Sequence, residues 1–365
     1  PKGVEMPLAG LLNLLHWHRQ SPQPAGSGKT LQFAALGFDV AFQEIFTTLC
    51  EGGSLVLINE SLRRQPAQLL SLIAQHRIDR IFLPYIALQH LADAARESGE
   101  DISCLAHIVT AGEQLRITPA IRHFLQRAGN CRLHNHYGPT ESHVTTAYTL
   151  EQNPGQWSTL PPIGRPIANH RIYILDADKQ PVPLGVTGEI YIAGLGVARG
   201  YLNRPELTAG RFLPDPFAPE PAARMYKTGD LGRWLPDGNI DYLGRNDFQV
   251  KVRGFRVELG EIEAQLMRCH GVREAVVIAR HDGVDPQRLV AYLRPVDGVK
   301  LQPAKLRQQL AQHLADYMLP SAFVVLNTFP QTPNGKLDRQ ALPAPDSAAV
   351  VTRTYEAPVG ETETA

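Results

Sequence analysis

The feature that most constrains the fold is a regular alternation of short apolar runs and helical segments over residues 31–126. Strand-like runs lie at 31–35, 54–58, 80–83 and 106–111, and segments with helical spacing lie at 37–50, 65–76, 86–98 and 117–126. This alternation is typical of a layered α/β domain with mostly parallel strands. Ligands bind such sheets at the carboxyl ends of the strands. We therefore expect a site where Gly112-Glu-Gln and Tyr137-Gly-Pro follow their strands.

Shorter strand-like segments separated by turns follow from Gly164 onward. They lie at 171–175, 189–193 and 239–243, and they indicate a β-rich, barrel-like part of the large domain. The stretch from Gly194 to Gly200 is only superficially similar to G-x-G-x-x-G, the pattern of dinucleotide-binding folds. That pattern requires a helix directly after it. We expect a polar turn there instead, so we reject a dinucleotide site.

A smaller α+β domain is predicted after residue 246. Its strands are expected at 248–252, 275–279, 289–293 and 322–326, and its helices at 259–269 and 303–318. About 100 residues is an ordinary size for such a domain. The Pro-rich stretch from Pro343 has the composition of a linker. We thus predict a large domain over 1–246, a small domain over 247–342 and a linker over 343–365.

Net charge and cysteine spacing argue against several classes of protein. Lys+Arg and Asp+Glu both number 36 in 365 residues, whereas a nucleic-acid or anionic-membrane partner would favour a basic excess. No apolar run approaches the roughly 20 residues that span a bilayer. The four cysteines, at 50, 104, 131 and 269, form no C-x-x-C pair. We interpret them as reduced core residues of a cytoplasmic protein.

The stretch from Leu133 to Thr145 gathers chemical groups around a sharp turn. Gly138-Pro139 marks the turn, and Tyr137, Glu141 and the imidazoles of His136 and His143 flank it. An aromatic ring can stack on a base, and an acid can hold Mg²⁺ beside phosphates. The loop therefore suits a nucleotide. Taken alone, an ordinary surface turn explains it about equally well.

Motifs along nearly the whole chain give this turn a context. In order they are Pro1-Lys-Gly-Val4, Phe38-Asp-Val40, Asn135-His-Tyr-Gly-Pro-Thr-Glu141, Gly188-Glu-Ile-Tyr-Ile-Ala-Gly194, Ala198-Arg-Gly-Tyr-Leu-Asn-Arg-Pro-Glu-Leu-Thr208, Tyr226-Lys-Thr-Gly-Asp230, the run from Gly244 to Glu263, and Pro333-Asn-Gly-Lys-Leu-Asp-Arg339. Together they resemble the amino-acid adenylation domains of nonribosomal peptide synthetases, in the adenylate-forming superfamily. The resemblance implies an α/β adenylate-forming fold: a large domain of layered sheets with a distorted β-barrel, then a small α+β lid domain.

The resemblance lacks one part of the family pattern. The family has a further N-terminal portion that ends in a Gly/Ser/Thr-rich loop gripping the pyrophosphate, and Pro1-Lys-Gly-Val4 resembles the residues just after it. We therefore expect an N-terminally truncated large domain. The tail over 355–364 resembles a linker that enters a carrier-protein domain.

The reaction implied by the resemblance has two steps and uses ATP and Mg²⁺. An amino-acid carboxylate attacks the α-phosphorus of ATP and releases pyrophosphate. The phosphopantetheine thiol of a peptidyl carrier protein then takes the aminoacyl group. Lys336 would be the mobile cation, Glu141 the magnesium ligand and Asp247 the hinge of the small domain. A small MbtH-like helper protein is a further candidate partner.

The residues that match the family's nucleotide site lie at strand ends of the large domain. Asp230 would bind both ribose hydroxyls, and Tyr137 would stack on adenine. The other matching positions are Gly112, Glu113, Asn135, Gly138, Thr140, Tyr242 and Arg245. Without the resemblance, Asp230 has the alternative of a turn cap after Gly229, Tyr242 is equally explained by core packing, and Lys336 is better explained as an exposed turn lysine.

The residues that match the family's amino-acid pocket include one acid, Asp39. The full set is Asp39, Val40, Gln43, Phe82, Val109, Ala111, His136, Val144 and Thr145, with Lys336 at the mouth. A partly desolvated carboxylate requires a cationic partner, which a substrate α-ammonium supplies. An N-cap of helix 37–50 is the ordinary alternative for Asp39. The set closely resembles proline-selecting domains, so we expect L-proline, with pipecolate or a small aliphatic amino acid as the alternative.

Two other functions stay open on the sequence. The first is a ligase of the same superfamily that activates fatty or aryl acids. Asp39 argues against it, because a substrate without an ammonium group leaves this carboxylate unpaired. The second is an inactive fragment that binds nucleotide only, which the missing phosphate loop favours.

Overall fold

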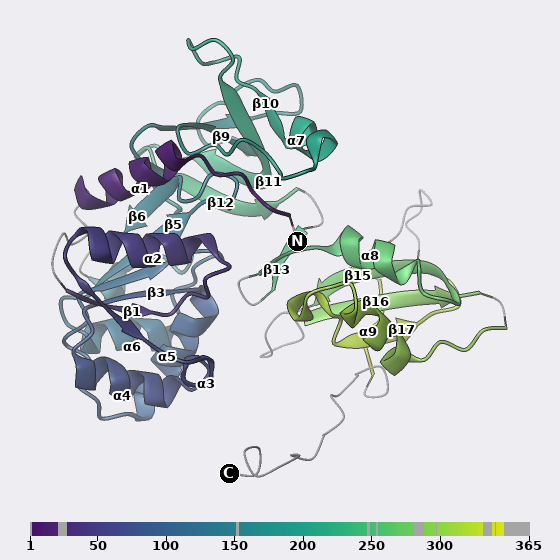
Figure 1. The fold of residues 1–365 in the computed structure, drawn as a ribbon, viewed down its shortest axis with the longest axis horizontal. Coiled ribbons are helices and arrows are strands. Elements are labelled where there is room, and N and C mark those ends of the chain that lie inside the picture. Colours follow the sequence, from purple (N-terminus) through teal and green to yellow (C-terminus); the bar gives the residue numbers. More distant parts are fainter. Residues whose placement is uncertain are drawn as a thin grey trace. The chain divides into compact units, whose positions relative to one another are not determined.

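The chain divides into two compact units, Pro1–Asp247 and Phe248–Ala365, in a computed structural model. The structure describes residues 2–20, 28–150, 153–246, 249–252, 255–280, 288–296, 298–330, 338–339 and 341–346. We describe each unit by itself (Figure 1). Among the helices of these residues, none combines the length and the apolar character that crossing a membrane requires.

The first unit is built on a seven-stranded sheet with the order β2-β1-β3-β4-β5-β6-β7. The strands are β1 (Lys29–Gln32), β2 (Ser54–Leu57), β3 (Arg80–Leu83), β4 (His107–Thr110), β5 (Arg132–Tyr137), β6 (Thr146–Thr149) and β7 (Arg165–Pro166). The pairs from β2 to β5 are parallel, and the last two pairs are antiparallel. The parallel α/β layer predicted for this region is confirmed.

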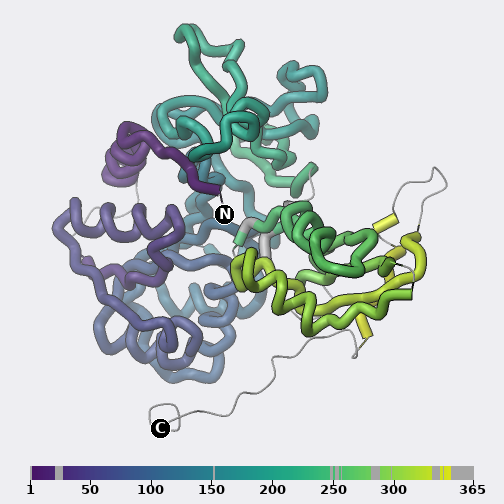
Figure 2. The backbone as a smooth tube through the Cα atoms, turned by 45° about the vertical axis from the view of Figure 1, so that its right-hand side comes forward, coloured from purple at the N-terminus to yellow at the C-terminus, as the bar shows by residue number. Residues whose placement is uncertain are grey.

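Helices cover both faces of this sheet (Figures 1 and 2). They are α1 (Leu8–Gln20), α2 (Asp39–Cys50), α3 (Glu60–Arg63), α4 (Pro66–His76), α5 (Tyr85–Glu97) and α6 (Pro119–Arg127). Ile81, Ile108 and Leu133 are register neighbours on β3, β4 and β5 and pack in one core with α4, α5 and α6. Because strand side chains alternate between faces, the intervening residues face α1 and α2. This second face carries most of the predicted amino-acid pocket.

The second sheet of the first unit is antiparallel. Its path is β10-β11-β9-β8, with β12 added to β11. The strands are β8 (His170–Leu175), β9 (Gly188–Gly194), β10 (Phe212–Pro214), β11 (Arg224–Trp234) and β12 (Ile240–Arg245), and α7 (Pro205–Arg211) precedes β10. A core that includes Ile190, Ile192 and Tyr226 also holds Tyr137 from the first sheet. The two sheets therefore meet at the turn after β5.

The second unit has the expected α+β composition. A hairpin joins β13 (Gln249–Val252) to β14 (Phe255–Glu258), and a second sheet has the order β15 (Val272–Arg280), β16 (Arg288–Pro295) and β17 (Ala322–Val325). Helices α8 (Leu259–Leu266) and α9 (Pro303–Ala311) share its main core. After the last strand, Leu342 is buried against this sheet, and the Tyr292 hydroxyl donates to the Pro343 carbonyl at 2.6 Å.

Four predictions of local structure are wrong. The helix expected over 303–318 ends at Ala311, and a separate 3-10 turn follows at Asp316–Met318, because the backbone of Ala315 between them is extended (φ −68°, ψ 152°) and cannot continue a helix. Strand β1 ends at Gln32 rather than near Ala35, because the Phe33 and Ala34 amides donate to the buried Glu44 carboxylate. Cys50 is exposed and not a core residue, although all four cysteines are free as expected.

The fourth correction concerns Asp39. The N-cap position of α2 is Phe38, and Asp39 is the first helical residue. Its Oδ1 accepts a hydrogen bond from the adjacent Val40 amide at 2.7 Å. Asp39 is therefore not the N-cap, and its second carboxylate oxygen is left for another partner.

Candidate active site

The turn after β5 is closely packed around Gly138. A Cβ at this position would lie 1.7 Å from the His143 carbonyl oxygen, so only glycine lets the two sides of the turn approach. His143 itself has φ 55°, in the left-handed region. The Thr145 amide then donates to the Tyr137 carbonyl at 2.8 Å and leads into β6. The predicted turn is confirmed, and Tyr137, Glu141 and His143 are buried instead of lying on the surface.

Glu141 is held inside this turn. It is 5% exposed, and its Oε1 accepts a hydrogen bond from the Tyr201 hydroxyl at 2.5 Å. The Ala198 amide donates to the Glu141 carbonyl at 2.8 Å. Burial, together with the Glu141 carboxylate, raises the pKa of Tyr201 far above its usual range, so the phenol stays protonated and donates. Tyr201 was not singled out from the sequence, although it lies in the motif Ala198–Thr208.

Asp230 contacts three other residues expected at a nucleotide site. It is 2% exposed, and the Tyr137 hydroxyl donates to its Oδ2 at 2.6 Å. Arg245 forms an ion pair with Oδ1, and the Tyr242 hydroxyl lies 3.5 Å from the same oxygen. Burial and the neighbouring Asp230 raise the pKa of Tyr137 well above 10. The alternative of a turn cap for Asp230 is wrong, because this residue lies within β11.

The other predicted nucleotide residues lie around this cluster. Gly112, with φ 86°, follows β4, and the next residue, Glu113, accepts the Ile86 amide at 3.1 Å. The Asn135 side chain is buried and donates to the Pro162 carbonyl at 2.9 Å. Thr140 is exposed on the turn. The side chains of Asn135 and Glu113 therefore bond to backbone groups of the segments around the Asp230 cluster.

The second face of the sheet carries an apolar patch beside a polar pair. Phe82 and Val109 are register neighbours on β3 and β4, and both are buried. On β5, His136 lies two positions after His134, which is the register neighbour of Val109. The buried His136 ring accepts a hydrogen bond from Gln43 Nε2 at 3.4 Å. Burial, with the nearby His18 and His143, lowers the pKa of His136 to about 3. The ring is therefore neutral, and its polar contact is made to the protein.

The remaining pocket candidates lie at the start of α2 and after the turn. Asp39 and Val40 are half-buried, and no described lysine, arginine or histidine forms an ion pair with Asp39. Val144 packs against Leu14 in a small core. The Thr145 hydroxyl is fully buried and donates to the Tyr137 carbonyl at 3.1 Å, so it shapes the backbone. Ala111 directly follows β4 and is half-buried.

A cluster of histidines on the same face of the sheet as Phe82 and Val109 escaped the sequence analysis. His107 Nδ1 lies 3.0 Å from His134 Nε2, and His134 Nδ1 lies 2.9 Å from the Thr149 hydroxyl. His18 on α1 is fully buried, and its ring nitrogens have no hydrogen-bond partner among the described residues. Burial lowers the pKa of His18 to about 3, that of His107 to about 4 and that of His134 to about 2. These rings are neutral polar residues of the core.

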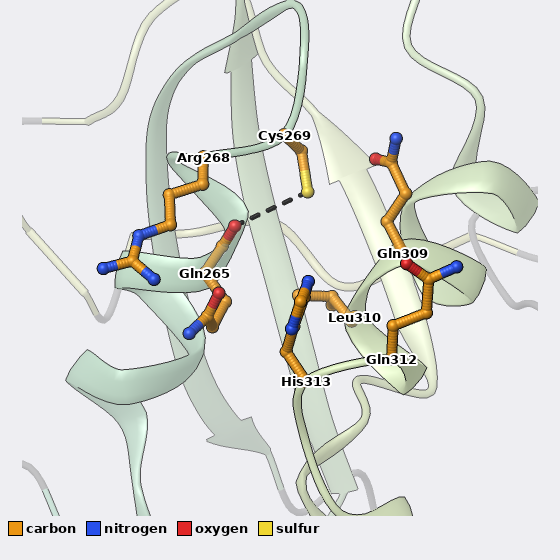
Figure 3. A pocket seen from close by; sticks show the side chains of 7 residues that line it. All are labelled: Gln265, Arg268, Cys269, Gln309, Leu310, Gln312 and His313. Atoms are coloured by element: carbon orange, nitrogen blue, oxygen red, sulfur yellow. Dashed lines mark hydrogen bonds between the residues drawn. The ribbon is translucent and has the colours of Figure 1, made fainter.

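Two predicted catalytic residues, Lys336 and Asp247, lie outside the described residues. In the second unit, a hollow of about 240 Å³ lies between α8 and α9 (Figure 3). Gln265, Cys269 and His313 are among the residues that line it, and it shares no residue with the predicted site.

The sequence matches the models of one family of enzymes. The AMP-binding enzyme model matches residues 1–202, and the model of the AMP-binding enzyme C-terminal domain matches residues 261–336. The chain therefore belongs to the AMP-binding enzyme family.

Within that family, it is similar to segments of peptide synthetases. It is 46% identical over 363 residues to gramicidin S synthase 2 of Brevibacillus brevis; the match covers all of this chain and 8% of that protein.

Two solved structures show the same fold. An artificially fused adenylation–PCP di-domain of a nonribosomal peptide synthetase from Klebsiella oxytoca is 27% identical, with a TM-score of 0.73 over 88% of this chain and 58% of that one. A four-domain nonribosomal peptide synthetase bound to AMP and glycine is 35% identical, with a TM-score of 0.60 over 98% of this chain and 26% of that one. The predicted resemblance and the predicted fold class are both confirmed.

Proposed function

We propose that this chain is the amino-acid-activating part of a nonribosomal peptide synthetase. It would couple an amino acid to AMP with release of pyrophosphate. One observation carries the proposal: a half-buried carboxylate, Asp39, has no cationic partner among the described residues. His143 of the turn that holds Glu141 bonds to the Asp39 carbonyl. An α-ammonium would satisfy Asp39, and the substrate carboxylate would then point toward the nucleotide.

The nucleotide would bind around Asp230. A carboxylate that accepts two hydrogen bonds at once suits the two ribose hydroxyls. In the present state Tyr137, Tyr242 and Arg245 occupy its oxygens, so the ribose would replace some of these bonds. Replacing satisfied bonds by equivalent ones costs little, whereas an unsatisfied buried carboxylate would be costly. The cluster is thus prepared for the hydroxyls without an unpaired charge.

Glu141 fits the role of a magnesium ligand. Magnesium is typically bound through one or two carboxylates plus substrate phosphates, and the described residues contain no cluster of three or more acids, histidines or cysteines that could hold a metal. The Tyr201 hydroxyl fixes Oε1 of Glu141, and the carboxylate so oriented would bind the ion. When bound, the ion would neutralise charge on the phosphates. Glu141 and Tyr201 would fix its position.

The roles of Lys336 and Asp247 and of the partner proteins are proposed from the family alone. Lys336 would approach the reacting carboxylate and phosphate, and rotation at Asp247 would exchange this lysine for the hairpin β13–β14. A carrier protein would present its phosphopantetheine thiol, as the adenylation–PCP relative from Klebsiella oxytoca suggests by its composition. An MbtH-like protein is a further partner in this proposal.

The substrate we propose is L-proline. Phe82 and Val109 offer an apolar surface, and the two polar groups beside them, Gln43 and His136, bond to each other. None of these four side chains carries a charge, so a charged substrate side chain would lose its hydration without gaining an ion-pair partner. A compact apolar ring fits best. Pipecolate and small aliphatic amino acids are the competitors.

Amino-acid-dependent ATP–pyrophosphate exchange in the full-length protein that contains this chain tests the proposal. We expect proline to give the highest rate and Asp39→Ala to abolish it. Asp101→Ala, at an exposed loop carboxylate on the same unit, is the control and should leave the rate unchanged. A highest rate with glutamate or lysine would refute the substrate, and a highest rate with an aryl or fatty acid would refute the amino-acid class. ATP binding by calorimetry without any exchange would indicate a nucleotide-binding remnant.

A further inference from the structure

His143 connects the two loops that carry the proposed amino-acid site. Its Nε2 lies 2.9 Å from the backbone oxygen of Asp39, and its Nδ1 lies 2.8 Å from the Val144 amide nitrogen. The ring is buried, and the Phe42 ring packs against it at 6.3 Å between centroids. A single side chain on the turn is thus bonded to the first residue of α2 and to the turn's own backbone.

The two partners define the protonation of this ring. A backbone carbonyl only accepts, so Nε2 must carry the proton that it donates to Asp39. A backbone amide only donates, so Nδ1 must be unprotonated to accept from Val144. In this arrangement Nε2 is the donor to Asp39 and Nδ1 is the acceptor from Val144.

The backbone of the turn is shaped to bring His143 to this place. Its φ of 55° is in the left-handed region, which residues other than Gly, Asn and Asp rarely adopt. The preceding side of the turn is Gly138, where any Cβ would collide with the His143 carbonyl. An unfavourable conformation at a functional turn is maintained only when surrounding contacts fix it. Here the contacts are the bonds to Asp39 and Val144.

We propose that His143 is a positioning residue for the substrate α-ammonium. This inference rests on the proposed function, in which Asp39 binds that group. The His143 ring fixes the Asp39 backbone at the N-terminus of α2, and the Val144 bond fixes the ring. The Asp39 carboxylate is thereby held at a set distance from Glu141, two residues from His143. The position lies outside the set of residues that would contact the substrate side chain.

Two variants separate the two bonds. In His143→Asn, the side-chain oxygen can still accept from Val144, the residue type tolerates the left-handed backbone, and the bond to Asp39 is lost. In His143→Gln, the longer amide can donate to the Asp39 carbonyl from about the place of Nε2. We expect His143→Asn to raise the KM for proline about tenfold, with kcat and the KM for ATP changed less than threefold. His143→Gln should restore the KM for proline to near the wild-type value.

Pyrophosphate exchange in the full-length protein, with thermal melting to verify folding, provides the measurement. His16→Asn, at an exposed histidine on α1, is the control and should change none of these constants. Should His143→Asn fail to fold, His143→Gly accepts the same φ and removes the same bond.

An unchanged KM for proline in His143→Asn or His143→Gly would overturn the positioning role. Equal increases in the KM for proline and the KM for ATP would overturn it as well. Failure of the wild-type protein to exchange pyrophosphate with any amino acid would instead refute the proposed function.

Discussion

Replacing His18 by leucine should make the first unit more resistant to acid. The pKa of His18 is about 3, against 6.5 for a free side chain, mainly because the residue is fully buried. A histidine whose pKa is depressed in the folded protein binds its proton more readily when unfolded. The free energy of unfolding is therefore unaffected by this titration above pH 6.5, and it decreases as the pH falls from 6.5 toward 3.

The magnitude follows from the size of the shift. Each pH unit below 6.5 costs about 1.4 kcal/mol for one such group, so His18 lowers the free energy of unfolding by about 2 kcal/mol at pH 5. His18→Leu removes this loss. At pH 7.5 the substitution breaks no hydrogen bond, because the ring nitrogens have no partner among the described residues. Leucine is similar in size, so little change is expected there.

Guanidinium unfolding followed by tryptophan fluorescence provides the assay. All three tryptophans, Trp17, Trp157 and Trp234, lie in the first unit, so the signal reports on that unit. The difference in unfolding free energy between His18→Leu and wild type should grow by about 2 kcal/mol between pH 7.5 and pH 5. His16→Leu, at an exposed position on the same helix, should show no such growth. A constant difference across this range would refute the assignment of His18 as a buried neutral ring.

Three further substitutions test other contacts of the site. Tyr201→Phe removes the bond to Glu141 and should lower the free energy of unfolding by about 1.5–3 kcal/mol; calorimetric titration should also show weaker magnesium–ATP binding, and unchanged values would contradict this role. Gly138→Ala should prevent the turn from closing on His143 and abolish nucleotide binding, measured the same way. Burial raises the pKa of Glu44 to about 7, so the Glu44 contribution to stability, about 3 kcal/mol below pH 4.5, is lost as the pH rises through 7; the difference in unfolding free energy between wild type and Glu44→Gln should change by about this amount over that range in denaturant titrations.

The sheet was predicted well, because strands that are buried on both faces appear in the sequence as short apolar runs. The strands β3 and β4 were placed within a residue of their observed bounds, and both are buried on each face. The motif Asn135–Glu141 likewise located the turn and its carboxylate. These features depend on local sequence and on a resemblance that spans the chain.

Features that depend on contacts between distant residues were not predictable. β1 ends early because the Glu44 carboxylate accepts hydrogen bonds from the two amides that follow the strand. Glu44 lies eleven residues further along the chain than Phe33. Tyr201 reaches Glu141 from sixty residues away. The buried histidines escaped because polar residues on a strand are usually assigned to solvent. Only the packed structure shows where such polar groups find partners.

The central claim is that the first unit holds an amino acid against ATP. Trapping the product with hydroxylamine measures this directly, because an aminoacyl adenylate yields the aminoacyl hydroxamate. With the full-length protein, ATP and proline, we predict prolyl hydroxamate by mass spectrometry and none from Asp39→Ala. Hydroxamate formation that is equal in wild type and Asp39→Ala, or that requires a substrate without an amino group, would contradict the account.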